Sequence, residues 1–218
     1  MEVLVVTGSS RGIGAEICRA AAAKDWAVCV NYATSTDEAE LVVKDIEQAG
    51  GRAISVSADV SIDSEVAALF ERVDAELGPI TGLVNNAGIN GGGTRVDELD
   101  VDQARRIFEV NILGSFLCAK HAIRRMAKRY GGVGGSIVNI SSAASKHGGP
   151  GTYIDYAASK GCHRHLYRRT GQGAGTGRDS GQLFAPRRHH DRTQCRVGPT
   201  ESRVAERGNG AGPARATR

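Results

Sequence analysis

Residues 3–14 read VLVVTGSSRGIG, and they indicate the architecture of the whole chain. Residues 3–7 form a short apolar run without polar alternation, which is typical of a buried strand in a parallel sheet. Gly8, Gly12 and Gly14 follow on a turn that leads into a helical pattern. Glycine lets the backbone approach a phosphate closely, and a helix start offers free N–H groups. The stretch therefore predicts a phosphate-binding turn; a tight turn without a ligand is the alternative.

The same alternation of strand and helix continues to about residue 160. Strand-like apolar runs are predicted at residues 3–7, 27–31, 53–57, 82–86 and 136–141. Helical patterns lie between them, at residues 12–23, 36–49, 64–77 and 101–130. Short apolar strands separated by helices predict a parallel sheet that is covered on both faces. We therefore predict a single α/β domain, residues 1–161, with a doubly wound parallel sheet.

The charge of the chain is divided unevenly. The 218 residues have a formal net charge of +4. Residues 1–160 carry 16 Lys and Arg against 20 Asp and Glu, whereas residues 161–218 carry 12 Arg, no Lys and 4 acidic residues. The second segment has only four Leu, Ile, Val or Met residues, so it lacks the apolar area that offsets the entropy of ordering. We predict that residues 162–218 form a disordered, Arg- and Gly-rich tail.

Several functional classes do not fit this composition. The apolar run at residues 3–6 is too short for a membrane span or a signal peptide. The five cysteines show no C-x-x-C spacing and the histidine pairs have no acidic or cysteine cluster beside them, so we expect reduced thiols, no metal site and a cytoplasmic location. The basic tail has only Tyr167 and Phe184 as aromatic residues, which argues against nucleic acid binding.

The end of the second predicted strand favours NADP(H) over NAD(H). In a dinucleotide-binding fold, an acidic residue about 20 residues after the glycine turn binds the ribose 2′-OH of NAD. Here the strand ends in Asn31, Tyr32 and Ala33, and the next carboxylate is Asp37. A 2′-phosphate therefore meets no repelling carboxylate, and Arg11 in the glycine turn can bind it. The alternative interpretation of Arg11 is a solvated turn residue.

Tyr156 and Lys160 stand four residues apart in the sequence YAASK, on one face of any helix that they share. A nearby ammonium stabilises a phenolate, so this pair can donate or accept a proton at a carbon-bound oxygen. Hydride delivery to a carbonyl builds negative charge on that oxygen, which needs donors aimed at it. Ser142 and Tyr156 provide such donors. The neighbouring Ser141 is expected to bond to the backbone at the strand end.

Five motifs together resemble the short-chain dehydrogenase/reductase family. They are TGSSRGIG, LVNNAG at residues 83–88, VNILG around Asn111, IVNISS ending at Ser142, and YAASK, and they occur in the order that the family shows. The resemblance covers residues 1–161. It implies a single-domain Rossmann fold and an oxidoreductase that interconverts a carbonyl and an alcohol of a small-molecule substrate, with a nicotinamide cofactor.

The resemblance also assigns roles to single residues. Tyr156 is the general acid/base, and Lys160 supports it and holds the nicotinamide ribose. Ser142 binds the substrate carbonyl, and Asn111 supports a water relay to Lys160. The residues expected to bind the cofactor, with Asp59 and Val60 at the adenine, are Gly8, Ser10, Arg11, Gly12, Ile13, Gly14, Asn31, Asp59, Val60, Asn86, Ala87, Gly88, Tyr156 and Lys160.

The family pattern stops after Gly161. Family members continue with a further strand, a Pro-Gly turn, a helical segment over the substrate and a final strand, and residues 162–218 show none of them. A frameshift near codon 161 or 162 explains this loss, and it predicts that the strand at residues 136–141 lies at an edge. The family forms homodimers or homotetramers, and the altered sequence argues against that assembly here. A catalytically impaired nucleotide-binding protein is the alternative function.

Overall fold

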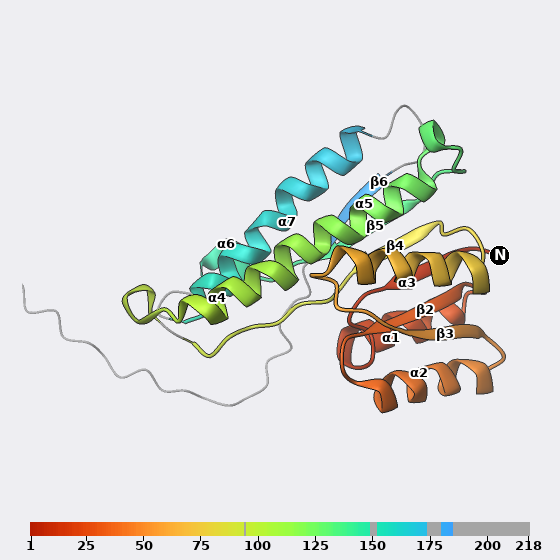
Figure 1. Ribbon diagram of the computed structural model, residues 1–218, viewed down its shortest axis with the longest axis horizontal. Helices are drawn as coiled ribbons and strands as arrows, with labels where there is room; N and C mark the ends of the chain where they lie inside the picture. Colours follow the sequence, from red (N-terminus) through yellow and green to blue (C-terminus); the bar gives the residue numbers. More distant parts are fainter. Residues whose placement is uncertain (94, 149–151, 174–179, 185–218) are drawn as a thin grey trace, which may run out of the picture. The chain divides into compact units, whose positions relative to one another are not determined.

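The apolar runs of the sequence pair into one six-stranded sheet in the order β3-β2-β1-β4-β5-β6, and every pairing is parallel (Figure 1). The structure is a computed structural model that describes residues 1–93, 95–148, 152–173 and 180–184. The chain divides into the units Met1–Arg188 and His189–Arg218, and the described residues belong to the first. The strands are β1 Val3–Val6, β2 Ala27–Tyr32, β3 Arg52–Ser57, β4 Gly82–Asn85, β5 Ser136–Ile140 and β6 Ser180–Phe184.

Helices cover both faces of the sheet, which confirms the predicted doubly wound fold. Along β1, Val3 and Val5 pack with α3 and α5, while Leu4 and Val6 pack with α1 and α2 on the other face. The strand is apolar throughout because both of its faces are buried. The helices are α1 Gly12–Ala22, α2 Thr36–Gln48, α3 Asp63–Glu76, α4 Val101–Phe108, α5 Gly114–Met126, α6 Ala144–His147 and α7 Ile154–Gly173, with 3-10 turns η1 Val96–Glu98 and η3 Lys128–Tyr130.

The order of the strands reverses between β1 and β4. The chain builds β1, β2 and β3 outward in one direction and then places β4 on the opposite side of β1. At such a point the loops that leave two neighbouring strands diverge and open a crevice at the carboxyl ends of the strands. The glycine turn follows β1 and Asn86 follows β4, so two of the sequence motifs meet at this crevice.

The prediction of one continuous helix at residues 101–130 was wrong. The structure divides it into α4, a π-helical turn η2 Glu109–Leu113, α5 and η3. A π-helical turn inserts one extra residue without ending the helix, so the apolar periodicity on either side does not reveal it. The turn contains Asn111, one of the predicted site residues.

The expectation that β5 lies at an edge of the sheet was also wrong. The helix α7 continues to Gly173, and β6 pairs with β5 in parallel register from Ser136 opposite Ser180 to Ile140 opposite Phe184. An edge strand joins a sheet through backbone hydrogen bonds, which leave little signature in composition averaged over a long segment. The predicted disorder of residues 174–179 and 185–218 lies outside the described residues. None of the described helices is long and apolar enough to cross a membrane.

Candidate active site and cofactor cleft

The turn after β1 is fixed by the end of β2. Gly8 has a φ of +58°, and a Cβ at this position would lie 2.8 Å from Cα of Ala87. The Gly8 N–H donates to Oδ1 of Asn31 at 3.1 Å, and the Ser9 N–H donates to the Asn31 carbonyl at 2.8 Å. Only glycine accepts both this dihedral angle and this close approach, so the first glycine is needed for the shape of the turn.

The start of α1 leaves its positive end available. Arg11 occupies the N-cap position without a side-chain cap, and the first turn of the helix has no acidic residue. Within the part of the chain that the structure describes, the backbone N–H groups of Ser10 and Arg11 have no hydrogen-bond acceptor. Uncapped N–H groups and the helix dipole together favour an anion at this end. The geometry fits a diphosphate.

Asn86 joins the loop after β4 to the glycine turn. Its Nδ2 donates to the carbonyls of Thr7 and Gly8, at 2.9 and 2.8 Å. A Cβ on Gly14 would lie 2.6 Å from this Nδ2, so the third glycine lets α1 pack against the amide. Oγ1 of Thr7 also accepts the backbone N–H groups of Asn86 and Ala87, both at 3.0 Å. The crevice between β1 and β4 therefore has a rigid floor.

A cavity of about 390 Å³ opens beside this floor. Its lining includes ten of the residues expected at the cofactor, namely Gly8, Ser10, Arg11, Ile13, Asn31, Asp59, Val60, Asn86, Ala87 and Gly88. It also includes eight residues that the sequence analysis did not select: Tyr32, Ala33, Thr34, Ser35, Ala58, Ile89, Arg106 and Val110. Gly12 and Gly14 lie in the first turn of α1, and Tyr156 and Lys160 lie on α7.

Arg106 of α4 is the charged residue that the sequence analysis missed. Its guanidinium forms an ion pair with Asp59 at 2.5 Å and donates to Oγ of Ser61 at 2.8 Å. Burial raises the pKa of Asp59, but hydrogen bonds from Ser61 and Arg106 outweigh it and hold that pKa below its usual value. The two residues are 47 positions apart, so no local motif connects them. Asp59 is the one carboxylate among the residues that line the cavity, and its charge is paired.

Lys160 lies behind the edge of the cavity. Its side chain is only 3% exposed, and Nζ donates to the Ile140 carbonyl at 3.1 Å. Nζ lies 5.7 Å from the ring centre of the half-buried Tyr156 and 3.0 Å from the point that a Cβ of Gly88 would occupy. Burial lowers the pKa of Lys160 from 10.5 to about 8, so the amine is still mostly protonated at neutral pH. The ammonium is thus close both to Gly88 of the cavity lining and to the Tyr156 ring.

The two serines at the end of β5 have different environments. Ser141 is buried, and its Oγ donates to the Lys160 carbonyl at 3.2 Å, which confirms the expected bond to backbone. Ser142 is half-buried, and its Oγ accepts the Ala144 N–H at 3.2 Å. The hydroxyl proton of Ser142 is therefore not used in that bond. Ser142 has a donor to offer to a substrate oxygen.

Asn111 lies fully buried in the π-helical turn. Its Oδ1 accepts the Ile89 N–H at 2.8 Å, and its Nδ2 donates to the Ile89 carbonyl and to Oγ of Ser159, both at 2.9 Å. The side chain therefore ties the loop after β4 to α7. All these contacts are with protein groups, so the amide itself holds the site together.

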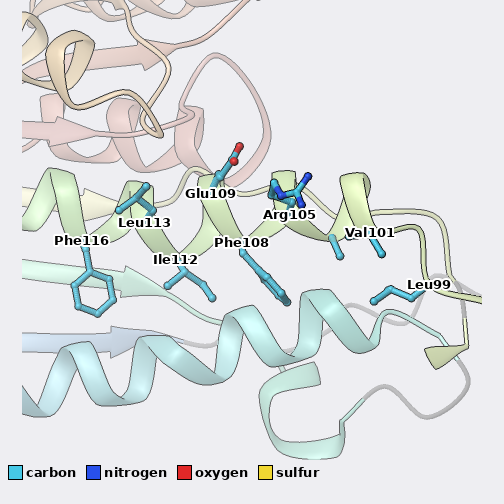
Figure 2. Close-up of a pocket in the computed structure, with 9 residues that line it drawn as sticks. Leu99, Val101, Arg105, Phe108, Glu109, Ile112, Leu113 and Phe116 are labelled. Atoms are coloured by element: carbon cyan, nitrogen blue, oxygen red, sulfur yellow. The ribbon is translucent and has the colours of Figure 1, made fainter. Parts of the chain in front are cut away.

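A second cavity, of about 640 Å³, lies along α4, η2 and α5. Figure 2 shows Phe108, Ile112 and Phe116 pointing away from the same side of this helical segment. The lining is mainly apolar, and Val101 and Phe116 are 62% and 47% exposed.

The described residues contain no cluster of three or more His, Cys, Asp or Glu side chains that could hold a metal ion. Cys18, Cys29, Cys118 and Cys162 are free thiols, and Cys195 lies outside the described residues. Burial raises the pKa of the Cys18 and Cys118 thiols to about 12. These two thiols are protonated packing residues and carry no chemistry in the described part of the chain.

The fold and the site define a class of protein: a nucleotide-binding α/β fold whose glycine turn, helix start and cavity meet where the strand order reverses. Residues 2–176 match the sequence profile of the short chain dehydrogenase family. The chain therefore belongs to the short-chain dehydrogenases, a family of oxidoreductases.

Individual relatives agree with this assignment. An uncharacterized oxidoreductase of Escherichia coli, YgfF, is 44% identical over 161 residues, which are 74% of this chain and 65% of that protein. A short-chain dehydrogenase/reductase from Serratia marcescens superposes with a TM-score of 0.76 at 30% identity, over 84% of this chain and 72% of that one. A blue fluorescent protein from a metagenomic library, solved with NADPH, has a TM-score of 0.73 at 32% identity, over 80% and 69% of the two chains. The chain thus spans slightly less than two thirds of the length of its E. coli relative.

Proposed function

We propose that the chain interconverts a carbonyl and an alcohol with NADP(H) as its cofactor. The observation that carries this proposal is the position of Gly88. This residue lines the cavity beside the glycine turn, and its missing side chain leaves room for the Lys160 ammonium directly behind it. The cavity that fits a dinucleotide and the helix that carries Tyr156 and Lys160 therefore meet at one point of the structure.

The residues of the cavity would hold the cofactor in sections. The glycine turn and the start of α1 offer N–H donors to the diphosphate, Asp59 and Val60 would meet the adenine, and Lys160 would hold the nicotinamide ribose. When bound, NADP(H) supplies or accepts the hydride at the substrate carbon. The remaining chemistry, which is proton transfer and charge stabilisation at the substrate oxygen, belongs to side chains of this chain.

Tyr156 is the proton donor in reduction and the proton acceptor in oxidation. The ammonium of Lys160 lies beside its ring and stabilises the phenolate left after proton donation. The Ser142 hydroxyl would donate a hydrogen bond to the same substrate oxygen, where negative charge develops. The proposal thus assigns two donors and one cation to the single oxygen whose charge changes during the reaction.

The charges at the cavity support NADP(H) over NAD(H). Arg11 is exposed at the mouth of the cavity, and within the described residues its guanidinium has no ion-pair partner. The residues after β2 that line the cavity, Tyr32 to Ser35, carry no carboxylate. A 2′-phosphate would therefore meet an available cation and no unpaired acid, because Arg106 already pairs with Asp59. The neighbour solved with NADPH is consistent with this choice.

A nucleotide-binding protein without turnover is the second candidate. The cofactor side of the site lies within β1 to β4 and α4, whereas the matched part of the chain spans 65% of the E. coli relative. Binding could therefore persist where the substrate side of the family fold is altered.

Calorimetric titration with NADPH, run beside a turnover assay with a panel of ketones, separates the two candidates. The proposed enzyme binds NADPH and oxidises it in the presence of a ketone, and Tyr156→Phe binds NADPH equally well but with strongly reduced turnover. Binding without turnover in the unmodified chain favours the second candidate. Absence of binding contradicts both.

A further inference from the structure

The backbone carbonyl of Asn111 is held by two side chains. Oγ of Ser115 donates to it at 2.9 Å, and Nε2 of His163 lies 2.9 Å from it. A carbonyl oxygen has two lone pairs, so the two side chains fill it when Nε2 carries a proton. The resemblance to the family places a water at Asn111 that leads protons to Lys160, and this carbonyl has no acceptor position left for it.

His163 is built into the site. It is 1% exposed and lies on α7, three residues after Lys160 and seven after Tyr156. This spacing places all three side chains on one face of the helix. The imidazole is therefore aligned with the proposed catalytic pair.

The hydrogen-bond network assigns the tautomer of His163. Nδ1 is buried and has no hydrogen-bond partner among the described residues. With the proton on Nε2, the ring donates to the Asn111 carbonyl and leaves only an acceptor unpaired. With the proton on Nδ1, a buried donor would be unpaired and the Nε2 lone pair would face the carbonyl oxygen, which is repulsive. Nε2 also lies 3.2 Å from Oγ of Ser115, but the Ser115 hydroxyl donates to the same Asn111 carbonyl. The network therefore favours the neutral Nε2–H form.

We propose that His163 is a positioning residue that replaces the relay water of the site. Its Nε2–H occupies the Asn111 carbonyl, ties α7 to the π-helical turn, and excludes water from the position where a proton relay to Lys160 would begin. The assignment of a relay to this place rests on the proposed function, but the occupation of the carbonyl does not.

The electrostatic surroundings support a neutral imidazole. Burial is the largest cause that lowers the pKa of His163, and the nearby charge of Lys160 lowers that pKa further. The Asn111 and Ile140 carbonyls raise it by less. A second proton, on Nδ1, would make the ring a buried cation beside the Lys160 ammonium. The ring therefore stays a single N–H donor at neutral pH.

Nitrogen NMR of the full chain labelled with [15N]histidine tests the proposal without any need for turnover. The chain has six histidines, and His163→Gln identifies the resonances of His163 by their loss. We expect a protonated Nε2 and an unprotonated Nδ1 at neutral pH. A protonated Nδ1, or a doubly protonated ring, overturns the proposal. Where His163→Gln does not fold, substituting the other five histidines one at a time gives the same assignment.

Crystal structures of the unmodified chain and of His163→Ala test the exclusion of water. Loss of the ring opens space beside a polar carbonyl, which is the kind of site that water fills. We expect one ordered water on the Asn111 carbonyl in the variant and none in the unmodified chain. His147→Ala, at an exposed histidine, is the matched control and leaves the carbonyl unchanged. A water on that carbonyl in the unmodified chain overturns the proposal, and both structures are informative even if the chain has no reductase activity.

Discussion

Lys160→Met is expected to make the fold more stable at neutral pH. Burial lowers the pKa of Lys160 from 10.5 to about 8, which corresponds to a penalty of about 3 kcal/mol for the protonated side chain in the folded state. Methionine has a similar length and carries no charge. It loses the hydrogen bond from Nζ to the Ile140 carbonyl, which costs about 1 kcal/mol. The variant is therefore expected to gain about 2 kcal/mol in its free energy of unfolding at neutral pH.

The difference in free energy of unfolding between Lys160→Met and the unmodified chain changes with pH in one direction. Between about pH 8 and pH 10.5 the unfolded chain binds the proton of Lys160 and the folded chain does not. The free energy of unfolding of the unmodified chain therefore rises with pH relative to that of the variant. Above pH 10.5 the side chain is neutral in both states, the penalty is gone, and the unmodified chain becomes the more stable by about 1 kcal/mol.

Urea unfolding followed by circular dichroism, at several pH values between 7 and about 10, measures this difference. Lys44→Met, at an exposed lysine of α2, is the matched control and should show a small difference that does not change with pH. A constant difference between Lys160→Met and the unmodified chain over this range, or a loss of stability in Lys160→Met at neutral pH, would refute the reasoning.

Three further substitutions test the proposed site. Tyr156→Phe removes the proton donor and should lower turnover by roughly a hundredfold or more without a change in NADPH affinity, as measured by steady-state kinetics and calorimetry. Gly88→Ala places a Cβ about 3.0 Å from Nζ of Lys160, so it should lower turnover and displace the ammonium in a crystal structure; unchanged turnover would argue against contact between the cavity and α7. Arg11→Ala should weaken NADPH binding by about tenfold, the equivalent of one charge-assisted hydrogen bond, and leave NADH binding unchanged; equal losses for both cofactors would contradict the assigned role.

The sequence predicted the fold class because each strand of the core is a short apolar run that can be recognised locally. The run at residues 3–7 is apolar since β1 is buried on both faces, and its glycines must follow at once because the turn approaches Ala87 and Asn86 so closely. Because the motifs follow parallel strands, their loops lie together at the carboxyl ends of those strands. The cavity beside them includes ten residues that were selected from the sequence, and their roles in cofactor binding stay predictions.

The features that were missed depend on distant partners or on the backbone. Arg106 and Asp59 are brought together by the packing of α4 beside the loop that follows β3. No local sequence pattern indicates this pair. The π-helical turn at Asn111 continues into helix on both sides, so no helix end marks it in the sequence. The strand β6 joins β5 through the backbone ladder. His163 gains its role from the position of one carbonyl, which no sequence motif specifies.

The direct test of the proposed activity follows the hydride itself. NADPH carrying deuterium at the transferable position of its nicotinamide is incubated with the chain and a panel of ketones, and the alcohols are analysed by mass spectrometry. We predict one deuterium on the carbinol carbon of a product formed by the unmodified chain, and roughly a hundredfold less labelled product, or still less, from Tyr156→Phe in the same time. Bound NADPH with no labelled alcohol from any ketone, or equal labelling by Tyr156→Phe, would contradict the proposed function.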